Sequence, residues 1–211
     1  MQRPVWIKIC GITMPSDIDL IHSAGADAVG LNFIVRSKRR VDIQTARTIA
    51  EAAHGKLERV GVVADLEETQ ILDLVNVVGL DRIQLHGNEP EELVRRLGSL
   101  AYKAVGISCA ADVVAAESTS GPRLLADARL GELVGGTGTT FDWSLIEALC
   151  RKREVIVAGG LHPGNVSRAV RQLRPFGVDV ASGVEEPSSP GLKSELLVRR
   201  FVQEIRTVAT V

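Results

Sequence analysis

Two side chains in this sequence have the chemistry needed for proton transfer, the thiol of Cys10 and the carboxyl group of Asp127. Each ends a short apolar run, and Cys10 is followed directly by Gly11. A thiol is a competent general base only as the thiolate, so the pKa of Cys10 would have to fall from its ordinary value of about 8.5. The carboxyl group is the matching acid. An inert, buried position for Cys10 and a capping role for Asp127 are the alternatives.

Two glycine turns indicate a phosphate-binding site. Gly159 and Gly160 follow one apolar run, and Ser182 and Gly183 follow the next. Glycine allows backbone N–H groups to approach an anion closely. Residues 135–138, GGTG, could add further donors. One such turn is common after any strand, so the prediction depends on finding two in succession.

The densest positive charge lies at residues 36–40, RSKRR. Such a run usually forms a solvated loop, and the alternative is that one arginine binds a substrate carboxylate through two parallel hydrogen bonds. We interpret His86 as a hydrogen-bonded residue at a strand end rather than an acid or base. The remaining histidines lack the spacing of metal-binding motifs, so we expect no metal site.

Apolar runs alternate with helix-like segments along the whole chain. The runs lie at residues 5–10, 28–33, 59–63, 82–86, 101–105, 123–127, 154–158 and 178–181. Many lack regular polar alternation, which is typical of parallel strands covered by helices. Helical patterns lie at residues 17–24, 43–53, 67–78, 89–97, 142–150 and 163–173, and a last helix carries Leu192, Leu196, Leu197 and Ile205. We expect Ser16, Asp42 and Asp65 to cap the first three helices.

Eight strand–helix units of about 26 residues each fill the 211 residues, with no linker and no change of composition. This pattern favours an α/β fold, a (β/α)8 barrel forming a single domain over residues 1–211. A doubly wound open sheet is the structural alternative. In a (β/α)8 barrel the active site forms at the C-terminal ends of the strands. The thiol, the imidazole, the carboxyl group and the glycine turns should therefore meet at one face.

Lys8 should point to the same side of its strand as Cys10, because side chains alternate along a strand. If that side is the barrel interior, the Lys8 ammonium could favour the thiolate. Closure of the barrel would place the last strand beside the first. We therefore predict an ion pair between Lys8 and Asp179, with the two groups within about 4 Å.

Composition excludes several classes of protein. The formal net charge is −1 and aromatic residues make up 3% of the chain, which argues against a nucleic-acid or membrane surface. Three separated cysteines, Cys10, Cys109 and Cys150, form neither a disulfide scaffold nor a zinc ribbon and fit a reducing cytoplasm. Without a long apolar run or a signal-peptide core, we expect a cytoplasmic protein that is not secreted by that route.

Seven motifs together resemble the phosphoribosylanthranilate isomerase family of tryptophan biosynthesis. They are KICGIT at 8–13, RSKR at 36–39, QLHG at 84–87, GGTGTTFDW at 135–143, AGGLHPGNV at 158–166, GVDVASGVE at 177–185 and PGLK at 190–193. They follow the family's order and spacing. The resemblance implies a (β/α)8 barrel that acts on N-(5-phosphoribosyl)anthranilate, a small-molecule substrate, without metal or cofactor.

The resemblance also implies roles for single residues. Asp127 matches the general acid that protonates the furanose ring oxygen, and Cys10 matches the general base that removes the C2 proton. The product of this Amadori rearrangement is 1-(2-carboxyphenylamino)-1-deoxyribulose 5-phosphate. Arg39 matches the arginine that holds the anthranilate carboxylate, and His86 lines the site. Gly159, Gly160, Ser182 and Gly183 match the phosphate cradle.

The sequence differs from the family's usual pattern at three positions. Val35 stands where proline is frequent, Ile34 where an aromatic residue is frequent, and Val63 where phenylalanine is frequent. We expect these residues to leave fewer aromatic side chains around the anthranilate ring. The alternatives are another phosphosugar barrel enzyme, with a different or second aminoaldose substrate, or a non-catalytic phosphate-binding barrel. The oligomeric state stays open between monomer and homodimer.

Overall fold

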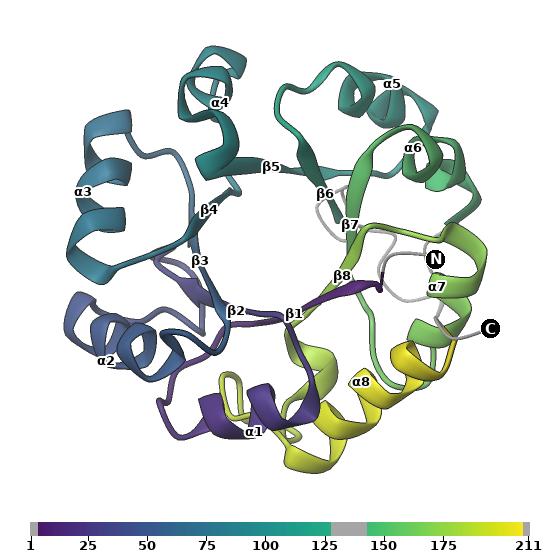
Figure 1. The fold of residues 1–211 in the computed structure, drawn as a ribbon. Coiled ribbons are helices and arrows are strands. Elements are labelled where there is room, and N and C mark those ends of the chain that lie inside the picture. Colours follow the sequence, from purple (N-terminus) through teal and green to yellow (C-terminus); the bar gives the residue numbers. More distant parts are fainter. Residues whose placement is uncertain (1–3, 128–142, 209–211) are drawn as a thin grey trace.

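The computed structural model describes residues 4–127 and 143–208, which form a closed barrel of eight parallel strands ringed by helices (Figure 1). The strands are β1 (Trp6–Cys10), β2 (Ala28–Asn32), β3 (Glu58–Val63), β4 (Arg82–Leu85), β5 (Ala101–Gly106), β6 (Arg123–Asp127), β7 (Glu154–Ala158) and β8 (Gly177–Val180). They pair in chain order, and β8 closes the barrel against β1. The predicted (β/α)8 fold is confirmed, and the open sheet is excluded. A single domain over residues 1–211 stays a prediction.

Helices follow the strands on the outside of the barrel. They are α1 (Asp17–Ala24), α2 (Ile43–Ala53), α3 (Glu68–Val78), α4 (Glu91–Leu97), α5 (Ala110–Ser118), α6 (Glu147–Lys152), α7 (Val166–Leu173) and α8 (Glu195–Val208). Three short 3₁₀ helices, η1 (Gly98–Leu100), η2 (Trp143–Ile146) and η3 (Ser182–Val184), complete the described elements. No helix among the described residues is long and apolar enough to cross a membrane.

Apolar residues of the strands form two separate cores, one on each side of the sheet. Residues such as Ile7, Ile9 and Val178 belong to the large cluster between the barrel and its helices. Residues such as Val60, Leu125 and Ile156 belong to a smaller cluster inside the barrel. Because both faces are buried, polar alternation is absent from most strands, and the few polar residues on inward positions become conspicuous.

Helix ends agree with the sequence at some caps and differ at others. Asp42 caps α2 by accepting a hydrogen bond from Thr45 N at 2.7 Å, as expected. Ser16 precedes α1, but its side chain makes no capping hydrogen bond. Asp65 was expected to cap α3, and this is wrong: Glu67 is the N-cap and forms a capping box with Gln70. Asp65 instead has a left-handed backbone (φ 56°), and its carboxylate accepts from Asn88 N at 2.6 Å.

Helix α4 begins at Glu91 rather than at residue 89, with Pro90 at its N-cap. The segment expected at 142–150 is split into η2 and α6. The GGTG segment at residues 135–138 and Asp142 lie outside the described residues.

Candidate active site

A buried polar network crosses the centre of the barrel. Lys8 lies opposite Asp179 in the pairing of β1 with β8, and Lys8 Nζ is 2.9 Å from Asp179 Oδ1. The predicted ion pair is confirmed. Gln84 lies opposite Tyr102 in the pairing of β4 with β5, and Gln84 Oε1 accepts hydrogen bonds from Lys8 Nζ at 2.9 Å and Tyr102 Oη at 3.3 Å. The Lys8 side chain is fully buried, so its charge acts through a medium that screens little.

The network also fixes the state of His86, which follows β4. Because Lys8 and Tyr102 donate to Gln84 Oε1, the amide nitrogen Nε2 is left to donate to His86 Nδ1 at 3.0 Å. His86 Nδ1 is then an acceptor, and Nε2 carries the ring proton. Burial lowers the pKa of His86, and the charge of Asp127 opposes that effect. His86 is therefore a hydrogen-bonded residue at the end of its strand, as the sequence predicted.

Cys10 ends β1 on the same face as Lys8. A Cβ built on Gly30 of β2 would lie 2.6 Å from Cys10 Sγ and 3.0 Å from Lys8 Cε, so a glycine at position 30 makes room for both side chains. Burial raises the pKa of the Cys10 thiol, whereas the Lys8 and Lys193 ammonium groups lower it and Asp179 raises it further. The expectation that Lys8 favours the thiolate has the right direction, but burial outweighs it.

Arg39 lies directly over the turn that follows Cys10. Gly11 has φ 73°, and a Cβ there would be 2.3 Å from Arg39 Cδ, so the arginine stem occupies the space that a side chain would take. Arg39 is half-buried, whereas Arg36, Lys38 and Arg40 are exposed. Most of the RSKRR run is therefore a solvated loop, and Arg39 alone of its basic residues lies against the turn after β1; its binding of a substrate carboxylate stays a prediction.

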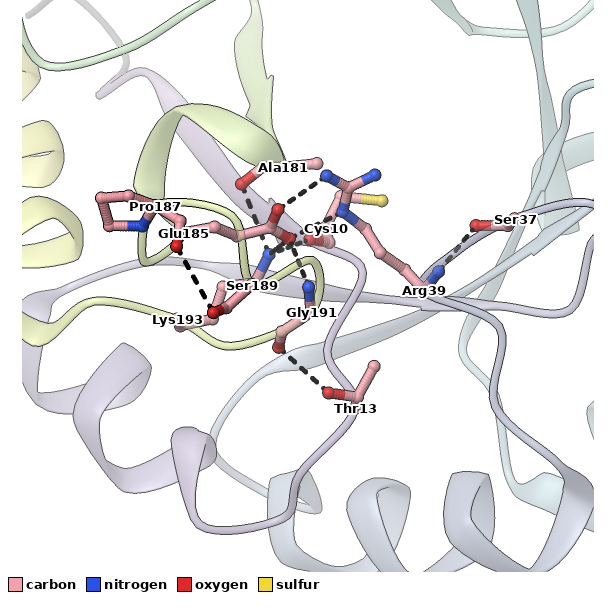
Figure 2. A network of polar contacts seen from close by, with 10 residues as sticks. All are labelled: Cys10, Thr13, Ser37, Arg39, Ala181, Glu185, Pro187, Ser189, Gly191 and Lys193. Carbon is pink, nitrogen blue, oxygen red and sulfur yellow. Dashed lines mark hydrogen bonds and ion pairs between the residues drawn. The ribbon is translucent and has the colours of Figure 1, made fainter.

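The Arg39 guanidinium is held on one edge by Glu185, which follows η3. Arg39 Nε donates to Glu185 Oε1 and Nη2 to Glu185 Oε2, both at 2.6 Å. Lys193 Nζ donates to Glu185 Oε1 and to the carbonyl oxygen of Cys10, both at 2.8 Å. Figure 2 shows these groups converging from the ends of β1 and β8 and from the loop after β2. Arg39 and Cys10, separate in sequence, are thus joined through a shared polar network.

Asp127 is the last residue of β6, between Gly106 of β5 and Ala158 of β7 in the strand pairing. Leu125 on the same strand belongs to the interior cluster, so alternation turns the Asp127 side chain inward as well. The carboxyl group is half-buried, and its charge acts on His86. β1 and β6 therefore present Cys10 and Asp127 at the same end of the barrel, as predicted.

The two glycine turns pack against each other. Gly159 and Gly160 follow β7 with φ 87° and 68°, values that favour glycine. A Cβ on Gly183 would lie 1.9 Å from the carbonyl oxygen of Leu161. Among the described residues, the N–H groups of Gly160, Ser182 and Gly183 donate to no backbone or side-chain acceptor of the protein. These donors at adjacent strand ends are available to an anion.

The three positions expected to thin the aromatic lining border one cavity. Val63 is 1% exposed and belongs to the outer cluster beneath the helices. Val35 is 78% exposed, and Ile34 is half-buried. All three line a cavity of about 350 Å³ between the loops after β2 and β3, and Phe33 is its aromatic residue.

Sequence reasoning gave no role to Gln84, Tyr102, Glu185 or Lys193, although all four belong to the networks described above. Gln84, Glu185 and Lys193 each lie within a motif of the family resemblance, QLHG, GVDVASGVE and PGLK. Their positions within these motifs were the sequence signal that could have identified them. Tyr102 lies in none of the seven motifs. In the described part of the chain, no group of three or more histidine, cysteine, aspartate or glutamate residues is arranged to hold a metal ion.

Comparisons with known proteins agree with this arrangement. The family model for N-(5'-phosphoribosyl)anthranilate (PRA) isomerase matches residues 7–204. The N-(5'-phosphoribosyl)anthranilate isomerase of Rubrobacter xylanophilus is 43% identical over 205 residues, covering 95% of this chain and 98% of that protein.

Two solved structures are also similar. Monomers of the dimeric phosphoribosylanthranilate isomerase from Thermotoga maritima superpose with a TM-score of 0.84 at 38% identity, covering 96% of this chain and 99% of theirs. A phosphoribosylanthranilate isomerase in complex with reduced 1-(o-carboxyphenylamino)-1-deoxyribulose 5-phosphate superposes with a TM-score of 0.83 at 37% identity, with the same coverage.

Proposed function

The chain belongs to the N-(5'-phosphoribosyl)anthranilate isomerase family, and we propose that it catalyses that isomerisation with Cys10 as general base and Asp127 as general acid. The observation that carries the proposal is the joining of Cys10 and Arg39. The carbonyl oxygen of Cys10 accepts from Lys193, Lys193 donates to Glu185, and Glu185 accepts from the guanidinium of Arg39. A base and a carboxylate-binding group are thus held next to each other at the barrel mouth.

The reaction is an internal redox shift that begins with two proton transfers and ends in a tautomerisation. Asp127 gives a proton to the furanose ring oxygen, the C1–O bond breaks, and the open chain is a Schiff base. Cys10 as thiolate then takes the C2 proton, which yields an enolamine, and the enolamine becomes the ketone by gaining a proton at C1 and losing the proton of its C2 hydroxyl. Atoms and electrons balance without an external oxidant.

The charges around the site match a substrate with a phosphate and a carboxylate. Arg39 contacts the carboxylate through the guanidinium edge that Glu185 leaves free. Gly160, Ser182 and Gly183 direct N–H groups to the phosphate. Lys8 and Lys193 favour the thiolate of Cys10, so they offset part of the cost of burying it.

Two coarser expectations concern the compartment and the oligomeric state. Cys10, Cys109 and Cys150 are all free thiols, which fits the cytoplasm. The Thermotoga maritima relative is described as dimeric, and this chain is a monomer or a homodimer.

Two variants test the proposal by the disappearance of substrate fluorescence. Cys10→Ala and Asp127→Asn should each lose about 10²- to 10⁴-fold in turnover while remaining folded, since each removes one proton-transfer group. Cys150→Ala is the matched control, because Cys10 and Cys150 are both 8% exposed but Cys150 lies on α6 in the outer cluster. Near-normal turnover in Cys10→Ala or Asp127→Asn would remove that residue from the mechanism.

A further inference from the structure

We propose that Glu185 is a positioning residue that presets the Arg39 guanidinium for the carboxylate of the substrate. This inference rests on the proposed function. It adds a third participant to carboxylate recognition, one that does not touch the substrate itself.

The geometry divides the guanidinium into two edges. Glu185 takes the edge formed by Nε and Nη2, with both contacts at 2.6 Å. Among the described residues, Nη1 of Arg39 has no protein acceptor. The remaining edge, Nη1 with the second hydrogen of Nη2, can still bind a carboxylate through two parallel hydrogen bonds. Glu185 therefore selects which edge faces the substrate.

Glu185 is itself held rigidly. Its side chain is 5% exposed, and it accepts hydrogen bonds from Lys193 Nζ at 2.8 Å and from Gly191 N at 3.0 Å. Although burial raises its pKa, the hydrogen bonds from Arg39 and Lys193 lower the pKa of Glu185 to about 2. The carboxylate is thus charged under all ordinary conditions, and one anion lies between two cations.

The stem of Arg39 is fixed from the other side. Its Cδ lies over the glycine turn after Cys10, and Arg39 N donates to Ser37 Oγ at 3.1 Å. A free arginine loses rotamer freedom when it binds a ligand, and a preset arginine has already lost it. The contribution of Glu185 to ligand binding should therefore appear only with ligands that carry the carboxylate.

The test compares two stable ligands that differ by that one group. The first is reduced 1-(o-carboxyphenylamino)-1-deoxyribulose 5-phosphate, and the second is the same molecule made from aniline, without the carboxylate. Calorimetry gives Kd for each with the wild type, Glu185→Gln, Arg39→Gln and the double variant. We expect Glu185→Gln to raise the Kd of the carboxylated ligand about 10- to 100-fold, which corresponds to the loss of one charged hydrogen bond. Binding of the aniline ligand should change less than about threefold.

The control and the second variant separate positioning from folding. Glu58→Gln removes a carboxylate at the opposite end of the barrel, where Glu58 contacts Arg82 at 2.8 Å, and should change neither Kd. Glu185→Asp keeps the charge but cannot reach both nitrogens, so it should reproduce the selective loss even if Glu185→Gln is unstable. In the double variant the loss should not exceed that of Arg39→Gln alone.

Several results would overturn the inference. Equal losses for both ligands would make Glu185 a residue of the fold, and so would failure of both Glu185 variants to fold. Tighter binding of the carboxylated ligand would show that Glu185 competes with it. Failure of the wild type to bind that ligand or to isomerise the substrate would instead reject the proposed function, which distinguishes the two failures.

Discussion

Replacing Lys8 with methionine would leave a carboxylate uncompensated at the centre of the barrel. Lys8 is fully buried, and the side chain of its partner Asp179 is only 9% exposed. The same substitution removes the 2.9 Å donor to Gln84 Oε1, which would keep only the longer contact from Tyr102. The methionine fills much of the lysine's volume, so the main effect is electrostatic rather than a cavity.

The magnitude follows from the burial of both groups. Removing one member of a buried ion pair typically costs about 3–5 kcal/mol, because the other charge stays desolvated. For a chain of this size, that loss lowers Tm by roughly 6–20 °C. Lys8→Met/Asp179→Asn removes both charges and should recover at least half of the lost free energy of unfolding. A buried pair therefore predicts that the two substitutions are not additive: the double variant should lose less free energy of unfolding than the sum of the two single losses.

Urea unfolding followed by circular dichroism measures the stability of Lys8→Met, Asp179→Asn and the double variant. Lys56→Met is the control, because the Lys56–Asp19 pair has the same 2.8–2.9 Å separation but side chains that are 41% and 85% exposed. It should cost less than about 1 kcal/mol. A loss of less than 1 kcal/mol for Lys8→Met, or a double variant no more stable than the single one, would refute the electrostatic account of this network.

The same substitutions should also move the pH profile. Lys8 lowers and Asp179 raises the pKa of Cys10. In Lys8→Met the charge of Asp179 is no longer opposed by that of Lys8, so the rising limb of kcat/KM, which reports formation of the thiolate, should move to higher pH. In Lys8→Met/Asp179→Asn the two effects are removed together, and the limb should return toward its wild-type position. An unchanged limb in Lys8→Met would show that Lys8 does not influence the pKa of Cys10.

Two further predictions concern the base and the phosphate cradle. In the wild type, kcat/KM should increase with pH above neutrality, because burial raises the pKa of Cys10 and only the thiolate accepts the proton; a pH–rate profile measures this, and a profile flat from pH 6 to 9 would contradict it. Gly183→Ala should raise KM at least about tenfold, since its Cβ would lie 1.9 Å from the Leu161 carbonyl and shift the cradle. Gly55→Ala, at φ 73° with nothing within 4 Å, should cost about 1–2 kcal/mol of stability and leave KM unchanged.

The sequence was sufficient for the barrel because its signals are local and repeated. Each apolar run is one strand, and predicted strand ends agree with the observed ones to within a residue. The Lys8–Asp179 pair was also predictable, because closure of a parallel barrel sets β8 beside β1 and alternation fixes the faces. Local capping was less reliable: Asp65 has a suitable side chain, but its carboxylate is used by Asn88 N from the next strand's loop.

The pairing of Arg39 with Glu185, unlike that of Lys8 with Asp179, does not follow from strand order or alternation. For this reason the sequence alone could not show which basic residue of the RSKRR run enters the site. Each of its basic residues satisfies the local requirements of a solvated loop, and only Arg39 lies against Gly11 and reaches Glu185, 146 positions away. That contact depends on loop paths after β2 and β8, which no periodicity encodes. Lys193 then connects the pair to the backbone of Cys10. In a site of this type, side chains from one loop contact partners on the loops of other strands. Motif residues without an evident role in the reaction, such as Glu185 and Lys193, are therefore the best candidates for positioning residues.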